Sequence, residues 1–301
     1  MIGRTALAVV SLLVAGNPQA AEVLHHALQI TLQPGTHRLT AQDTITLPRG
    51  LAHGKTLHFR LHTGLAPRVL NAKATLEPVA PKAGVAAGAF TQEYVLTLPP
   101  GARDIQLEYG GEIYHALSDA GAELAGGMRD SAGIIAPEGV FLDGTSAWYP
   151  QFAEDELMSF ALEARLPKDW DAVSQGARTR HDVDADMRVV RWEEQHPQDE
   201  IYLIAAPFTQ YTQTTGGVQA MVFLRTPDEA LARTYLDATV RYTNMYSQLL
   251  GPYPYAKFAL VENFWESGFG MPSFTLLGSK VLRLPFIVNS SYPHEILHNW
   301  W

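Results

Sequence analysis

With 301 residues, 47% of them hydrophobic and 18% charged, the chain has the length of two domains and the composition of a folded protein. Its net charge of -9 and its lack of a Lys/Arg-rich segment argue against a nucleic-acid partner, because phosphates are bound by clustered basic side chains. The absence of cysteine excludes disulfides and thiolate chemistry, so any transition-metal site must use His and carboxylate ligands.

Residues 1–21 have the pattern of a secretory signal peptide. Arg4 precedes an apolar run at 6–15, and Ala20 and Ala21 precede Glu22, where we expect the mature chain to begin. The run is shorter than a membrane-spanning helix, which needs about 20 residues, and no later segment reaches that length. The pattern predicts a periplasmic or secreted protein. An uncleaved anchor and a frayed N-terminal helix are the alternatives.

Residues 22–219 are predicted to form an all-β domain. Apolar and polar residues alternate in short segments at 28–32, 57–61, 94–98, 105–109 and 160–166. This period of two puts apolar side chains on one face of a strand, and the Pro/Gly-rich turns between the segments leave no helical pattern. We therefore expect a sandwich or saddle of antiparallel sheets.

The pattern changes near residue 220. After a strand at 219–225, Thr226 and Pro227 predict the N-cap and first position of a helix that runs to 250, and Gly251 stands where its C-terminus is expected. Apolar residues recur at three- and four-residue spacing along this helix. A strand at 257–264 and a Gly-rich turn follow. Residues 220–301 are thus predicted to open a mixed α/β domain.

The motif that carries chemistry is His294-Glu295-Ile-Leu-His298. On a helix the two histidines lie one turn apart on the same face, where their imidazoles can bind one Zn²⁺ ion. Glu295 projects beside them and is placed to take a proton from a water molecule that the metal activates. Ser290 or Ser291 is predicted to cap this helix. A chance occurrence of the motif is the alternative.

Three segments of the chain resemble the aminopeptidase N family. They are the motif with its following tryptophans at 294–301, Gly-Pro-Tyr-Pro-Tyr-Ala-Lys at 251–257, and Trp-Tyr-Pro at 148–150. The resemblance implies a multidomain α+β protein, with an N-terminal β-sandwich or saddle domain (22–219) and the start of a thermolysin-like α/β catalytic domain (220–301).

The resemblance also implies a zinc metallopeptidase that acts on peptide or protein substrates. His294 and His298 would be zinc ligands, and Glu295 the general base. The family's third ligand is a Glu roughly twenty residues after the second His, a position that would lie beyond Trp301. By this resemblance we expect the sequence to be truncated after its motif. We therefore expect the 301-residue chain alone to be nearly inactive. Nothing in the sequence indicates an oligomeric state.

One segment departs from the family's pattern. The family's exopeptidase loop reads Gly-x-Met-Glu-Asn, and its Glu binds the free amino group of the substrate, whereas this chain has Gly268-Phe269-Gly270-Met271-Pro272-Ser273. Pro272 stands in the Glu position and cannot bind an ammonium group. The main chain at 270–273 is still expected to contact substrate. Glu262 and Glu266 are nearby acids that could replace the missing Glu, although solvated carboxylates are the more ordinary interpretation.

Other polar clusters are better explained without a ligand. The acids at 182–186 lack the Gly and the final Glu of a calcium loop, so a solvated hairpin tip is expected. His25, His26, His58 and His62 are expected on exposed strand faces. A second functional class stays open, namely a noncatalytic peptide- or protein-binding module with a degenerate peptidase domain.

Overall fold

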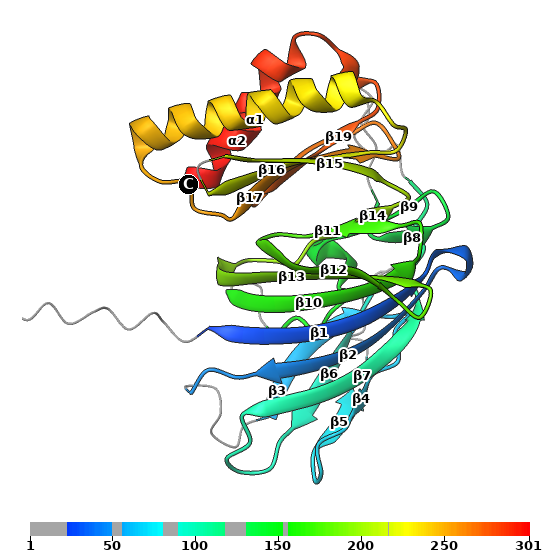
Figure 1. Cartoon of the computed structure of the whole chain (residues 1–301). Coiled ribbons are helices and arrows are strands. Elements are labelled where there is room, and N and C mark those ends of the chain that lie inside the picture. The colour runs from blue at the N-terminus through cyan, green and yellow to red at the C-terminus, as the bar shows by residue number, and fades with distance from the viewer. Residues whose placement is uncertain (1–22, 50–55, 81–89, 118–130, 153–155, 216) are drawn as a thin grey trace, which may run out of the picture.

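The computed structural model describes residues 23–49, 56–80, 90–117, 131–152, 156–215 and 217–301. The predicted signal segment at 1–21 lies outside these residues. Figure 1 shows stacked β-layers built from the N-terminal two thirds of the chain, with a further sheet and two α-helices above them. None of the helices in the described ranges is long and apolar enough to cross a membrane.

A seven-stranded sheet, in the order β12-β13-β10-β1-β2-β7-β4, is the largest layer. Its strands are β1 (Leu24–Gln33), β2 (Arg38–Thr46), β4 (Arg68–Val69), β7 (Asp104–Glu112), β10 (Met158–Pro167), β12 (Ala177–Asp184) and β13 (Met187–Gln198). All neighbours are antiparallel except β1 and β10, which run parallel. Buried and solvent-facing residues alternate along β1 and β2, as the period of two predicts.

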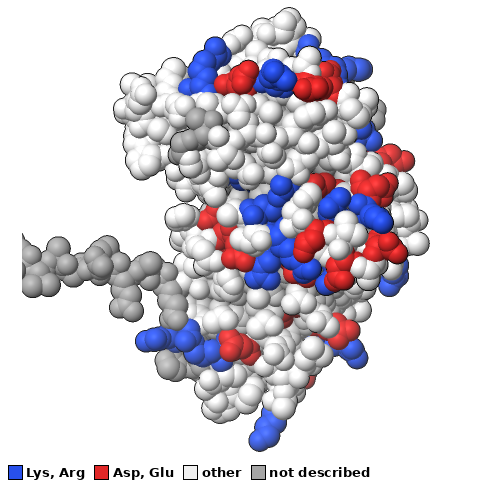
Figure 2. Space-filling model, viewed as in Figure 1, with Lys and Arg blue, Asp and Glu red and all other residues white. Residues whose placement is uncertain are grey.

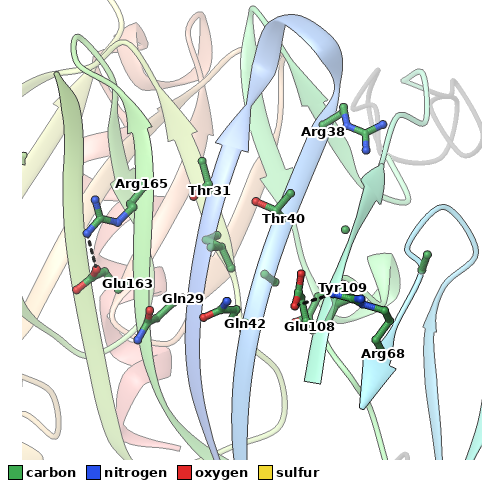
Figure 3. A pocket seen from close by; sticks show the side chains of 14 residues that line it. Gln29, Thr31, Arg38, Thr40, Gln42, Arg68, Glu108, Tyr109, Glu163 and Arg165 are labelled. Carbon is green, nitrogen blue, oxygen red and sulfur yellow. Dashed lines mark hydrogen bonds and ion pairs between the residues drawn. The ribbon is translucent and has the colours of Figure 1, made fainter. Parts of the chain in front are cut away.

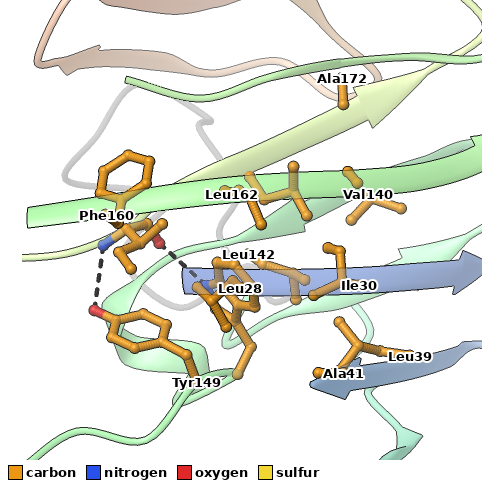
Figure 4. Packing of buried hydrophobic residues seen from close by; sticks show 14 of the residues in the cluster. Leu28, Ile30, Leu39, Ala41, Val140, Leu142, Tyr149, Phe160, Leu162 and Ala172 are labelled. Atoms are coloured by element: carbon orange, nitrogen blue, oxygen red, sulfur yellow. Dashed lines mark hydrogen bonds between the residues drawn. The ribbon is translucent and has the colours of Figure 1, made fainter. Parts of the chain in front are cut away.

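Two smaller sheets and two short 3₁₀ helices complete the N-terminal part. One sheet has the order β3-β6-β5 and the other β11-β14-β9-β8. Their strands are β3 (Thr56–His62), β5 (Thr75–Pro78), β6 (Thr91–Thr97), β8 (Ile134–Ala136), β9 (Gly139–Leu142), β11 (Asp171–Val173) and β14 (Leu203–Ala206), and the 3₁₀ helices are η1 (Pro34–Thr36) and η2 (Gly144–Ser146). Apolar side chains from the sheets meet in one core around Leu28, Ile30 and Leu162 (Figure 4).

The C-terminal part has a five-stranded sheet in the order β15-β16-β17-β19-β18. Its elements are β15 (Thr209–Thr215), β16 (Val218–Leu224), α1 (Glu229–Leu250), β17 (Lys257–Asn263), β18 (Gly268–Met271), β19 (Phe274–Gly278), η3 (Val281–Arg283), η4 (Ile287–Asn289), α2 (Ser291–Leu297) and η5 (His298–Trp300). The predicted long helix is present, but Asp228 caps it by accepting the Leu231 N–H at 3.0 Å, in place of Thr226. An Asp one residue before the helix is the better acceptor for that donor.

Both faces of the five-stranded sheet are covered. Met221 and Phe223 of β16 pack into the core of the N-terminal sheets, whereas Ala220, Val222 and Leu224 pack under α1 and α2. This two-sided burial explains why β16 is an almost continuous apolar run and does not alternate. The expected fold class is confirmed: a β-sandwich part followed by an α/β part. The division at 219/220 stays a prediction, and β15 of the second sheet lies before it.

Candidate metal centre

The two histidines of the motif face each other on the exposed side of α2 and η5. Their Nε2 atoms lie 2.9 Å apart, and the ring centroids are 4.4 Å apart at an interplanar angle of 84°. Tyr292 and Ile296 on the opposite side of the helix are buried against α1, which fixes the direction in which the histidines point. The predicted serine cap is absent, because the Ser290 hydroxyl donates instead to Phe286 O.

Glu295 lies beside a pocket of about 370 Å³. The lining residues are Tyr255, Gly270, Met271, Pro272, Glu295, His298 and Asn299. A Cβ atom at position 270 would lie 2.1 Å from Glu295 Oε2, so the carboxylate occupies the space that Gly270 leaves open. Three of the four loop residues expected to meet substrate therefore line one pocket with the candidate base. The fourth, Ser273, is fully buried behind them.

Two sequence segments that carry the family resemblance are in direct contact. Trp300 Nε1 donates to Gly251 O at 3.1 Å, and Tyr253 Oη donates to Asn299 Oδ1, also at 3.1 Å. Tyr255 of the same upstream segment reaches the pocket. Sequence reasoning did not assign Asn299 or Tyr255 to the site, although both belong to the segments it singled out.

Neither of the alternative acids reaches this pocket. Glu262 is 3% exposed; it accepts the Arg225 backbone N–H at 2.8 Å and pairs with Arg283 at 2.7 Å. Glu266 accepts the backbone N–H of Lys280. Both carboxylates thus stabilise loops of the α/β part. Among the described residues, Glu295 is the one acid that lines the pocket.

The residues present fit a partial zinc site. Two nitrogen ligands at about 2.1 Å from a tetrahedral zinc ion would lie about 3.4 Å apart, so a small rotation of either ring from the observed 2.9 Å separation would suffice. Two imidazole nitrogens this close together, on the helical segment that also carries Glu295, are a suitable donor set. Within the described ranges, however, no group of three His, Cys, Asp or Glu is placed to hold a metal ion.

A second pocket, of about 510 Å³, has no such chemistry. It lies on the solvent face of the seven-stranded sheet, where Gln29, Thr31, Thr40 and Gln42 form rows across β1 and β2 (Figure 3). An ion pair between Arg68 and Glu108 borders it at 3.1 Å. Amides and hydroxyls at alternate positions are the ordinary composition of a solvated sheet face.

The calcium-like segment is a charged hairpin tip, as expected. Asp182 pairs with Arg180 at 2.6 Å, Asp184 with Arg165 at 3.2 Å, and Asp186 with Lys168 at 3.3 Å. Figure 2 shows this mixture of positive and negative side chains over β10, β12 and β13. Because each acid already has a cationic partner, the segment offers no cluster of free carboxylates.

The histidines of the N-terminal strands divide into exposed and buried positions. His58 is exposed as predicted, but His26 and His62 are buried, so that prediction is wrong for these two. His26 Nδ1 lies 2.7 Å from Asp43 Oδ2, and His62 Nε2 lies 2.7 Å from His115 Nε2. Each buried ring has a polar partner inside the protein, which is what permits its burial.

No family model matches the sequence, and no curated protein matches it. Solved structures do. The M1 zinc metallopeptidase from Deinococcus radiodurans matches with a TM-score of 0.62 and 19% identity, over 93% of this chain and 63% of that chain. A mutant of that enzyme bound to a Tyr-Ser-Ala substrate matches with a TM-score of 0.60 and 18% identity, over 93% of this chain and 64% of that one. Native yeast LTA4 hydrolase matches with a TM-score of 0.65 and 12% identity, over 92% of this chain and 44% of that one.

The chain has the fold of the M1 zinc metallopeptidases. It spans less than two thirds of the length of each of these proteins. Because the sequence identity is low, this structural similarity shows the fold alone, and any chemistry has to be inferred from the side chains of this chain.

Proposed function

We propose that this chain is part of a zinc-dependent peptidase that hydrolyses peptide bonds. One observation carries the proposal: the Nε2 atoms of His294 and His298 lie 2.9 Å apart, and His298 lines the same pocket as Glu295. The fold supports it, because the matching structures from Deinococcus radiodurans are described as M1 zinc metallopeptidases. A zinc ion bound by these histidines would act as a Lewis acid that polarises the peptide carbonyl and acidifies a water molecule.

The side chains of the chain itself have separate roles in this proposal. His294 and His298 hold the metal through Nε2. Glu295 accepts the proton that the attacking water loses and donates it to the leaving amine nitrogen. Gly270 and Met271, at the end of β18, present main chain to an extended substrate, and the missing Cβ of Gly270 leaves room for the Glu295 carboxylate.

The proposal is peptide-bond hydrolysis without a commitment to aminopeptidase specificity. Pro272 carries no charge, and Glu262 and Glu266 stabilise other loops. A carboxylate next to the pocket is what an α-ammonium group requires. In the described part of the pocket, Glu295 is the one acid, and its proposed role is that of general base.

The test is the zinc content and peptidase activity of the protein that carries this chain. We expect about one zinc ion per molecule, hydrolysis that stops when a chelator removes it, and recovery when zinc is returned. The 301-residue chain assayed alone is expected to show little hydrolysis, since two imidazoles hold zinc weakly. Activity that survives complete zinc removal would contradict the proposal. A protein that binds peptides but holds no zinc would instead be the noncatalytic binding module.

We also propose that the protein is exported, to the periplasm or outside the cell. The support is the signal-like segment at 1–21. Mass spectrometry of the protein from its native host tests this: the mature chain should begin near Glu22, and an intact Met1 start would exclude cleavage.

A further inference from the structure

Ser273 adopts a backbone conformation that requires support. Its φ of 69° lies in the left-handed region, which residues other than glycine enter at a cost. The residue is fully buried between β18 and β19, directly after Pro272 of the pocket wall. The surrounding side chains must therefore hold this turn in place.

Lys257 provides the first support. This lysine is only 1% exposed, and its Nζ donates to Ser273 Oγ at 2.6 Å and to Ser273 O at 3.0 Å. Nζ also lies 5.0 Å from the ring centroids of Trp192 and Phe274, which surround the cation with aromatic faces. Burial lowers the pKa of Lys257, and the negative charge of Glu194 opposes that shift.

The same contacts join the two parts of the chain. Trp192 belongs to β13 of the seven-stranded sheet, and the backbone N–H of Gly176, before β12, donates to Ser273 Oγ at 3.2 Å. Lys257 and Ser273 belong to the five-stranded sheet and its turn. Ser273 thus receives hydrogen bonds from both parts of the chain, and its position depends on how they pack.

Asn299 provides the second support. Its Oδ1 accepts the Ser273 N–H at 2.6 Å, and its Nδ2 donates to Glu295 O at 2.9 Å. Because Asn299 directly follows His298, the turn is tied to the helix that carries the candidate zinc ligands. The N–H, C=O and Oγ of Ser273 are all engaged by Lys257, Asn299 and Gly176, which we call the Ser273 network.

We propose that Lys257 is a positioning residue for the peptidase site, acting through the Ser273 network to hold the pocket wall at 270–273 in the position where it contacts substrate. This inference rests on the proposed peptidase function. Lys257 touches neither Glu295 nor the two histidines, so its contribution is to the binding of substrate along the wall. A substitution there is expected to raise KM more than it lowers kcat.

Lys257→Met tests this, because methionine has a similar length but neither charge nor donors. Lys168→Met is the matched control, since the Lys168 side chain is 62% exposed and lies far from the pocket on the β10–β11 turn. In the full-length protein we expect Lys257→Met to raise KM about tenfold with kcat within about threefold of wild type, because both buried hydrogen bonds from Lys257 Nζ to Ser273 are lost. Zinc content should not change.

A second readout does not require activity. The Ser273 amide donates to Asn299, so its hydrogen exchange reports whether the network is closed. We expect this amide to exchange about tenfold faster in Lys257→Met, while the amides of α1 exchange as in wild type. If Lys257→Met does not fold, Ser273→Ala removes only the Oγ acceptor and should change KM and exchange in the same direction.

The outcomes are separable. Unchanged KM and unchanged Ser273 exchange would overturn the positioning role. A variant in which kcat, zinc content and thermal stability all fall while KM rises would also overturn it, because Lys257 would then be a purely structural residue. If the wild-type protein hydrolyses no peptide, the proposed function fails, and the exchange measurement still decides whether the Ser273 network holds the turn.

Discussion

Gly270 and Glu295 approach each other so closely that a Cβ atom at position 270 would lie 2.1 Å from the Glu295 carboxylate. The two residues come from different elements, β18 and α2, and meet at the pocket that His298 also lines. The position of the candidate base therefore depends on the absence of a side chain on the neighbouring strand.

Gly270→Ala is expected to displace the Glu295 carboxylate without unfolding the protein. The atom that must move is the end of a flexible side chain, so the free energy of unfolding should change by about 1 kcal/mol or less. We expect kcat to fall at least about tenfold, because a general base must lie within hydrogen-bond distance of its water. Zinc content should stay at the wild-type level.

Gly35→Ala is the control for this variant, since a Cβ at position 35 would meet nothing within 4 Å. If Gly270→Ala kept wild-type kcat, the contact between position 270 and the Glu295 carboxylate would have no part in catalysis.

Asp43→Ala is expected to destabilise the β-sandwich part by about 2–4 kcal/mol, because it leaves the buried His26 Nδ1 without a partner. His26 and Asp43 side chains are both 0% exposed. Urea unfolding followed by fluorescence measures the change. Asp104→Ala, an exposed substitution on the neighbouring strand, should cost about 0.5 kcal/mol or less.

Replacing both members of this pair with leucine should be less destabilising than Asp43→Ala, because no polar atom of the pair is then left buried. A double variant as unstable as the single one would show that shape, and not the hydrogen bond, dominates at this position.

The stability of the protein should fall as the pH drops from about 6.5 to about 4. Burial and the neighbouring His115 lower the pKa of His62 from 6.5 to about 4, so in this window the unfolded chain binds a proton that the folded chain excludes. The backbone N–H of Gly64 donates to His62 Nδ1 at 2.9 Å, so neutral His62 carries its proton on Nε2 and donates to His115. Protonation of Nδ1 would break the first of these bonds.

His62→Gln should reduce the slope of unfolding free energy against pH in this window by up to about 1.4 kcal/mol per pH unit. His58→Gln, on the exposed side of the same strand, is the control because it leaves the contribution of His62 in place. Equal slopes for wild type and His62→Gln would show that His62 titrates normally in the folded protein.

Local patterns predicted the parts of the structure that depend on neighbours in sequence. The four-residue spacing of His294 and His298 put them on one helix face, and the apolar spacing between 227 and 250 predicted α1. The predicted N-cap of α1, Thr226, lies two residues before the observed N-cap, Asp228. Residues 226–228 are all suited to a helix start, and the choice among them depends on backbone geometry.

Long-range partners were not predictable in this way. Lys257 is the first residue of β17, and lysine is usually exposed. Only the packing of Trp192 and Ser273 around it explains its burial. The parallel pairing of β1 with β10 joins segments more than a hundred residues apart. Glu262 was a candidate substrate ligand in the sequence, yet its partners Arg225 and Arg283 come from other loops.

The most direct test of the account is to compare Glu295→Gln with the wild-type full-length protein for both zinc content and peptide hydrolysis. Glutamine keeps the size of the side chain but cannot accept the proton, and it leaves His294 and His298 untouched. We expect zinc content to stay the same and kcat to fall by about a hundredfold or more. Hydrolysis at the wild-type rate by Glu295→Gln would contradict the assignment of this site as a metallopeptidase centre.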